Sequence, residues 1–128
     1  MLLKETTFAQ QQQMKPLNMP TAQKSIFVLH KGCYHNLRTA DVLWVSSEGN
    51  YAHIYTKDKH YFNRISLANL LKMLPATMFR KVHKCFLVRV DAIDHIDRSN
   101  NELFVAGNKI PIGRSYKASL LGQLNLIG

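Results

Sequence analysis

From residue 25 onward the chain alternates short apolar stretches with polar breaks, a pattern typical of a small β-rich domain. The breaks contain residues that favour tight turns, among them Lys31-Gly32, Gly49-Asn50 and Gly107-Asn108. Because the stretches follow one another closely, we expect them to pair as antiparallel hairpins. The pattern predicts strands over residues 25–30, 33–38, 41–47, 51–57, 60–64, 81–90, 92–97, 102–106 and 109–112.

Two segments have the spacing of amphipathic helices instead. In residues 66–74, leucines recur at the i, i+3, i+4 and i+7 positions behind Ser66, which can cap the first turn, and Pro75 ends the pattern. Residues 115–124 carry leucines on one stripe behind Ser115, a second candidate cap. We expect two short helices that cover the sheets, so the predicted fold class is mainly β.

The first 25 residues differ from the rest of the chain. A glutamine run at residues 10–13 and the prolines Pro16 and Pro20 leave no regular apolar period. We therefore predict a linker or flexible tail over residues 1–25 and one globular domain over residues 26–128.

The net charge adds a clue about the partner. The chain has 128 residues, with 17 Lys and Arg against 8 Asp and Glu, a formal net charge of +9. The first 25 residues hold three lysines and one glutamate, a net +2, so the other +7 belongs to the predicted domain. Such a basic domain is typical of proteins that meet phosphate backbones, anionic membranes or acidic proteins. No apolar run approaches the roughly 20 residues of a membrane span, and no secretory signal opens the chain, so we expect a cytoplasmic protein without a membrane partner.

Three places combine turn chemistry with polar or basic side chains. Residues 79–89 hold four Lys or Arg, one His and no acid, and neither face of a strand there is cleanly apolar. This mixture predicts that residues 80–84 lie at an exposed end and that the core strand begins near Cys85. The second place is the polar break at residues 46–51, and the third is residues 112–117, where a strand gives way to a helix. Taken singly, each place also fits a solvated surface or an ordinary loop.

Other classes of protein stay open from the residues alone. The H-x2-C-x-H spacing of residues 30–35, with His83 and Cys85 on one strand face, makes a metal-binding or redox-sensing module one alternative. A basic protein-interaction domain is another. The sequence has no nucleophile elbow, no phosphate-binding Gly-rich loop and no H-E-x-x-H motif. Our main interpretation therefore includes no enzyme activity, no catalytic residue, no cofactor and no metal.

Four segments together resemble a known family, the LytTR DNA-binding domain found at the C-terminus of many bacterial response regulators. They are residues 41–51, 64–67, 79–89 and 110–116, which stand in the family's order with similar spacing, and the resemblance covers about residues 26–124. It implies an elongated arrangement of three small antiparallel sheets with two short helices. It also implies loops that read successive major grooves of a duplex that bends to meet them.

The resemblance places the base-reading positions of the family at Asn50 and Tyr51, at Lys84, and at Arg114 and Ser115. These residues fall in the three places that charge and turn chemistry also indicate. Lys84 and Arg114 can donate to guanine, and Asn50 can pair with adenine. The resemblance therefore predicts sequence-specific binding by a transcriptional regulator.

Neighbouring side chains have other expected roles. Lys81 and Lys117 are expected to hold phosphates, which fixes the register on the duplex without reading its sequence. His83 is expected to orient its loop. The expected partner is double-stranded DNA, and the sequence leaves open a second copy on repeated half-sites and a receiver domain or sensor kinase of a two-component system. It also leaves open whether the chain is a stand-alone regulator, which Met1 permits, or an excised C-terminal domain.

Overall fold

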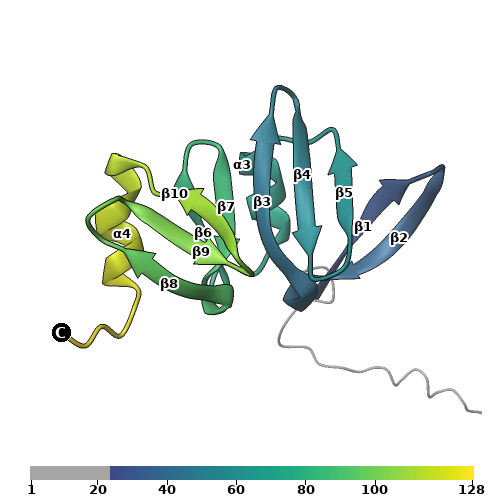
Figure 1. Ribbon diagram of the computed structural model, residues 1–128. Helices are drawn as coiled ribbons and strands as arrows, with labels where there is room; N and C mark the ends of the chain where they lie inside the picture. Colours follow the sequence, from purple (N-terminus) through teal and green to yellow (C-terminus); the bar gives the residue numbers. More distant parts are fainter. Residues whose placement is uncertain (1–23) are drawn as a thin grey trace, which may run out of the picture.

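The computed structural model describes residues 24–128, which fold into ten strands and a few short helices (Figure 1). Residues 1–23 of the predicted linker or tail lie outside the described residues. The strands are β1 (Ser25–His30), β2 (Cys33–Arg38), β3 (Val42–Glu48), β4 (Tyr51–Thr56), β5 (His60–Asn63), β6 (Phe79–His83), β7 (Phe86–Arg89), β8 (Ile93–Asp97), β9 (Glu102–Val105) and β10 (Asn108–Pro111). The α-helices are α3 (Leu67–Met73) and α4 (Lys117–Gly122), and the 3-10 helices are η2 (Thr39–Asp41), η3 (Val90–Ala92) and η4 (Arg114–Tyr116).

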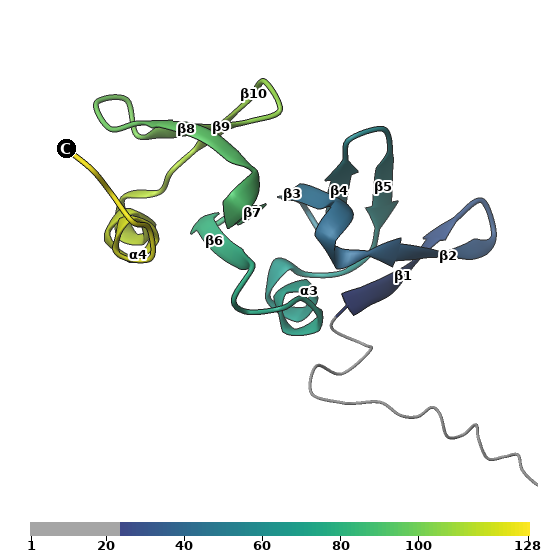
Figure 2. The same cartoon turned by 90° about the horizontal axis from the view of Figure 1, so that it is seen from below.

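The strands form three antiparallel sheets, as predicted. β1 pairs with β2, the central sheet has the order β5-β4-β3-β7-β6, and the third sheet has the order β10-β9-β8. The sheets follow one another along the molecule, with the β1–β2 hairpin at one end and α4 at the other (Figures 1 and 2). The prediction of a mainly β fold with three antiparallel sheets and two short helices is confirmed.

Two hydrophobic cores hold the sheets together, and the β6–β7 hairpin belongs to both. The first core contains Phe79 and Leu87, and the second contains Val82 and Val88. Leu87 and Val88 are neighbours in β7, so their side chains point to opposite faces of the strand, and neither is exposed to solvent. The hairpin is therefore packed on both sides. The first core is completed by residues of β1 to β5 and α3, and the second by residues of β9, β10 and α4.

This double burial explains why the predicted strand over residues 81–90 is wrong. The segment forms two strands joined by a tight turn at Lys84 and Cys85, with His83 paired to Phe86. A strand with one buried face shows a period of two, whereas β7 buries adjacent residues. The prediction that residues 80–84 lie at an exposed end is also wrong for most of that segment, because residues 80–83 belong to β6 and Val82 is fully buried. Only Lys84, in the turn itself, is exposed.

The first predicted helix is confirmed and the second is only partly so. In α3 the Ser66 hydroxyl caps the first turn by accepting a hydrogen bond from the amide of Asn69 at 3.1 Å. The second segment begins as the 3-10 helix η4 and continues as the six-residue α4, whose N-terminus has no side-chain cap. The prediction that Ser115 caps this helix is therefore wrong.

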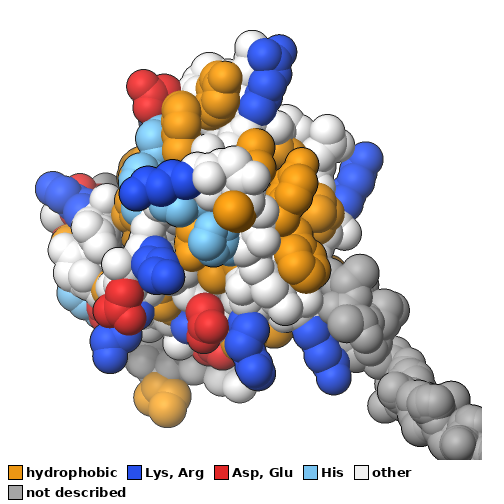
Figure 3. Space-filling model, turned by 90° about the vertical axis from the view of Figure 1, so that its right-hand side faces the viewer, with side chains coloured by type: hydrophobic (Ala, Val, Ile, Leu, Met, Phe, Trp, Pro, Cys, Tyr) orange, Lys and Arg blue, Asp and Glu red, His pale blue; other side chains and the backbone are white. Residues whose placement is uncertain are grey.

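The β1–β2 hairpin is attached to the central sheet by a side chain. The side-chain amide of Asn63 accepts a hydrogen bond at Oδ1 from the backbone amide of Leu29 at 2.9 Å, and it donates one from Nδ2 to the backbone carbonyl of Leu29 at 3.1 Å. The outer face of the hairpin leaves Phe27 61% and Tyr34 71% exposed. Figure 3 looks at this end of the molecule, where hydrophobic side chains lie among lysine, arginine and histidine side chains.

Candidate nucleic-acid interface

The three predicted contact segments meet along one edge of the molecule. The β3–β4 turn and the β6–β7 turn both lie at the upper edge in Figure 1, and Gly113, the residue before η4, is hydrogen-bonded to β6. Backbone hydrogen bonds tie them together, because the Ser47 amide donates to the Cys85 carbonyl at 2.9 Å and the Gly113 amide donates to the Val82 carbonyl at 2.7 Å. The edge is thus a continuous, backbone-supported surface.

The β3–β4 turn presents Asn50 to solvent. Gly49 has a φ of +61°, which the tight turn requires and which glycine adopts without strain. The Asn50 side chain is exposed and makes no hydrogen bond within residues 24–128. The ring of Tyr51, the next residue, stacks on Phe62 of β5 with centroids 4.5 Å apart, so this predicted contact residue is held by a neighbouring strand.

A shallow depression beside this turn contains an arginine that sequence reasoning missed. Gly49, Asn50, Arg64, Ile65 and Ser66 line it. Arg64 is exposed and has no ion pair or hydrogen bond in the described part of the chain. Its only sequence signal is its place in the second segment of the family pattern, because its proximity to Asn50 depends on how β5 continues toward α3.

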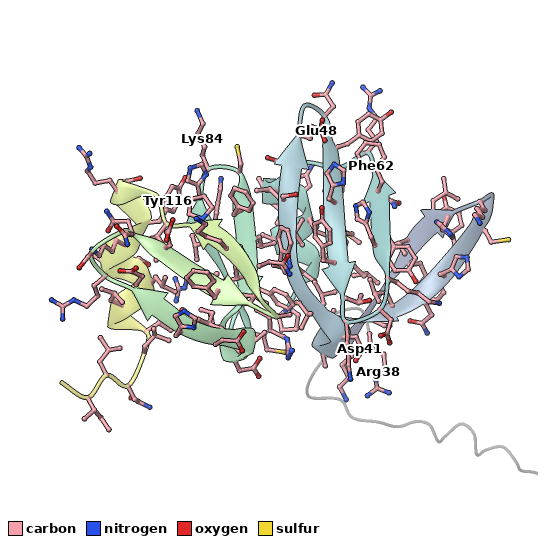
Figure 4. All side chains as sticks on the ribbon, in the orientation of Figure 1. Arg38, Asp41, Glu48, Phe62, Lys84 and Tyr116 are labelled. Carbon is pink, nitrogen blue, oxygen red and sulfur yellow. The ribbon has the colours of Figure 1, made fainter. Side chains whose placement is uncertain are left out.

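The β6–β7 turn places Lys84 at its tip, at the upper edge in Figure 4. Lys84 is exposed, and no described residue pairs with its ammonium group. The preceding His83 accepts a hydrogen bond at Nδ1 from the Cys85 amide at 3.1 Å, and its ring meets Phe86 edge to face at 5.5 Å. His83 is therefore built into the turn, which agrees with an orienting role.

Arg114 and Ser115 are exposed in η4, which a close contact holds against β6. A Cβ atom at Gly113 would lie 2.9 Å from Cδ2 of Tyr116 and 3.5 Å from Cα of His83. Only glycine therefore fits between the Tyr116 ring and the β6 backbone without displacement. This contact places the third segment directly beside the second.

The two predicted phosphate ligands have partners within the protein. The Lys81 ammonium lies 5.9 Å from the centroid of the Tyr116 ring, within the range of a cation–π contact. The Lys117 ammonium donates to the Arg98 carbonyl at 3.1 Å and to Oδ1 of Asn101 at 2.6 Å. Since an ammonium group has three donors, Lys117 keeps one for another acceptor.

A group of rings beside the edge was also missed by sequence reasoning. Nδ1 of His53, in β4, is hydrogen-bonded to Nε2 of His60, in β5, at 2.7 Å. Nε2 of His53 lies 2.8 Å from Oε1 of Glu48. Desolvation, and secondly the positive charge of a protonated His53, lower the pKa of His60. The alternation of Tyr51, His53 and Tyr55 puts these rings on one face of β4, but their partners on other strands depend on the register.

The predicted alternative of a metal site finds no support in the described chain. Within residues 24–128, no three His, Cys, Asp or Glu side chains gather where they could hold a metal ion. His30 and His35 of the H-x2-C-x-H segment meet edge to face at 5.5 Å, and Cys33 and Cys85 are free thiols. Among the helices formed by these residues, none has both the length and the apolar character needed to cross a bilayer.

Comparison with known proteins identifies the fold and the family. The pattern of the LytTr DNA-binding domain matches residues 32–125. The chain is 32% identical over 94 residues to the CO-responsive transcriptional regulator RcoM of Rhodospirillum rubrum and 28% identical over 92 residues to the sensory transduction protein LytT of Bacillus subtilis. These matches cover 67% and 69% of this chain but 39% and 38% of the two relatives, so the chain spans about two fifths of their length.

A solved structure supports the same assignment of the fold. It is the LytTr DNA-binding domain of a Bacillus cereus protein described as a methyl-accepting/DNA response regulator. The two chains are 20% identical and superpose with a TM-score of 0.68, which covers 77% of this chain and 97% of the other. LytTR domains are a family of DNA-binding domains and not of enzymes. Because the family pattern matches residues 32–125, most of the chain, and the fold agrees, this chain belongs to the LytTR DNA-binding domain family.

Proposed function

We propose that this chain is the output domain of a bacterial transcriptional regulator and that it binds double-stranded DNA at a specific sequence. The observation that carries the proposal is that Asn50, Lys84 and Arg114, each without a polar partner within residues 24–128, belong to three segments of a LytTR fold that backbone hydrogen bonds hold side by side. Side chains that are free of internal bonds can offer all their donors and acceptors to base edges. We infer that the three turns enter successive major grooves and that the duplex bends to reach them.

The side chains divide into base-reading and backbone-holding groups. The Lys84 and Arg114 donors suit guanine O6 and N7, and the Asn50 amide suits adenine. Tyr51 and Ser115 flank these positions and are proposed to contact the same base edges. Lys81 and Lys117 lie deeper and are partly engaged by the protein, which suits contacts to phosphates.

The wider assignments are proposals of the same kind. We infer that residues 26–128 are the DNA-binding unit, and that residues 1–25 link it to other parts of a regulator or form a tail. The proposed protein partners of this domain are a second copy bound to a repeated half-site and a receiver domain or sensor kinase of a two-component system. A protein with this role works in the cytoplasm of a bacterial cell.

The test is selection of bound duplexes from a random pool, followed by affinity measurements on the selected duplex and on random DNA. Lys84→Ala should weaken binding to the selected duplex by about 1–3 kcal/mol, or about 5- to 150-fold, and relax the preference at one base pair. Lys57→Ala is the matched control, because Lys57 is an exposed lysine at the β4–β5 turn on the opposite edge of the sheet (Figure 1). Equal losses for Lys84→Ala on selected and random DNA would contradict base reading, and a pool that yields no preferred duplex would contradict the whole proposal.

The bend is measured separately. Energy transfer between dyes at the two ends of the selected duplex should increase when the protein binds, because bending shortens the end-to-end distance. An unchanged end-to-end distance in the saturated complex would contradict the proposed bending and leave base reading standing.

A further inference from the structure

Six rings lie side by side on one face of the central sheet. They come from β3, β4 and β5, and four of the five ring pairs lie within 15° of parallel. Neighbouring centroids lie 3.9–4.9 Å apart. We call this group the ring column, and its order is Tyr51, Phe62, His53, His60, Tyr55 and Trp44. His53 and His60 lie edge to edge in nearly one plane, because their ring nitrogens meet at 2.7 Å while the ring centroids are 4.9 Å apart.

The ring column contains a chain of hydrogen bonds that ends at the candidate interface. Glu48 is the last residue of β3, two positions before Asn50, and its side chain is 78% exposed at the upper edge in Figure 4. Its Oε1 lies 2.8 Å from Nε2 of His53, whose Nδ1 lies 2.7 Å from Nε2 of His60. The protonation of His60 and His53 is thus connected to a carboxylate beside the proposed DNA contact.

The geometry accommodates no proton or one proton on the histidine pair, and it opposes a second. With both rings neutral, His53 donates through Nε2 to the carboxylate and accepts at Nδ1 from Nε2–H of His60. With one added proton, His53 donates from both nitrogens, to Glu48 and to His60. With two added protons, two N–H groups would face each other across the 2.7 Å contact, and the bond between the rings would break.

Each state gives the edge a different charge. With neutral rings, the three side chains carry the single negative charge of Glu48, which repels a nearby phosphate backbone. With one proton, His53 and Glu48 form an ion pair and their net charge is zero. DNA, as a polyanion, therefore favours the protonated state, and by linkage the protonated state favours DNA.

We propose that Glu48, His53 and His60 form a proton-linked positioning element of the β3–β4 turn, which takes up one proton when DNA binds and makes binding tighter at acidic pH. The proposal rests on the proposed DNA-binding function. His53 and His60 act through Glu48 and the turn, and they do not touch the bases.

Other titratable groups lie near this element. The ring of Tyr55 stacks on His60, and its centroid lies 6.3 Å from that of His53. The charged side chains of the adjoining β4–β5 turn are Lys57, Asp58 and Lys59. Another histidine, His83, lies at the end of β6 beside the β6–β7 turn. The diagnostic quantity is therefore the difference between wild type and a His53 variant, and not the pH profile alone.

The experiment compares DNA affinity at about pH 6 and about pH 8, on both sides of the histidine range, using a duplex selected from a random pool. Wild type should bind about three- to tenfold more tightly at the lower pH, which lies within the limit of about a hundredfold that uptake of one proton sets over two pH units. His53→Gln reproduces the hydrogen-bond pattern of the neutral histidine. At both pH values it should bind DNA with the affinity that wild type has at the higher pH. Glu48→Gln removes the negative charge and should bind tightly at both values.

The control is His95→Gln, which removes a histidine of the third sheet and should keep the wild-type profile. Thermal unfolding of each variant confirms that it folds. A His53→Gln profile that equals wild type on a duplex that both bind would overturn the element and leave the proposed function standing. Failure of all proteins to prefer any duplex would overturn the proposed function and this inference with it.

Nuclear magnetic resonance gives a second readout, since DNA should raise the pH midpoint of the His53 ring signals, and an unmoved midpoint would also overturn the element.

Discussion

Replacing Gly113 by alanine tests how the third contact segment is held against the second. The added Cβ would lie 2.9 Å from Cδ2 of Tyr116, so the ring must turn away and give up its place near the Lys81 ammonium. Overpacking of this kind costs about 1–3 kcal/mol. Gly113 has φ −69° and ψ 144°, which alanine also adopts. Alanine reduces the conformational entropy of the unfolded chain, which stabilises the folded domain by about 0.4–1 kcal/mol. The net result should be a loss of about 0.5–2 kcal/mol.

The same change should reverse its sign when Tyr116 is absent. In a Tyr116→Ala background, the nearest remaining atom of the close contacts is Cα of His83 at 3.5 Å, an ordinary van der Waals distance. Gly113→Ala should then be neutral or stabilise the domain by up to about 1 kcal/mol. The assay is equilibrium unfolding in urea for wild type, both single variants and the double variant. Equal destabilisation by Gly113→Ala in both backgrounds would refute the assignment of the close contact to the Tyr116 ring.

Three further changes test other contacts. Lys117→Ala should lower the slope of log affinity against log salt by about one with little change in base preference, since its ammonium keeps one free donor; an unchanged slope would assign it a structural role only. Asn63→Ala should cost about 1–3 kcal/mol of unfolding free energy and speed hydrogen exchange at the Leu29 amide, and slow exchange there would show that other contacts hold the hairpin. Hydrogen bonds from the Asn100 side chain and then its backbone lower the pKa of Asp97. Because the unfolded chain binds this proton at a higher pH than the folded chain does, Asp97→Asn should melt below wild type near neutral pH. The difference should shrink as the pH falls through the folded-state pKa of Asp97, and a difference that stays constant in acid would contradict this origin.

Most of the fold could be predicted because its signals are local. The strands at residues 25–30 and 33–38 and the Ser66 cap follow from alternation, turn chemistry and leucine spacing, and all three are observed. The prediction of a single strand over residues 81–90 is wrong because burial of both Leu87 and Val88 removes the period of two from the hydrophobic pattern. That burial comes from two cores whose other members lie far away in the chain.

The interface could be placed but not assembled from the sequence. Charge and the family resemblance marked Asn50, Lys84 and Arg114, yet whether they contact bases stays a prediction. Residue order carries no signal for the approach of Gly113 to His83, which are 30 positions apart, because it depends on how two sheets pack. The chain of hydrogen bonds through His53 depends on strand register for the same reason.

The strand that serves both cores has a consequence for how the domain unfolds. Without β7, the first core loses Leu87 and the second loses Val88, so each half lacks a buried wall of its own. Neither half of the chain is then a self-sufficient folding unit, although the molecule has two cores. Melting should occur in one cooperative step whose calorimetric and van't Hoff enthalpies agree. The spacing between the turns at the proposed DNA-facing edge should then persist until the whole domain unfolds.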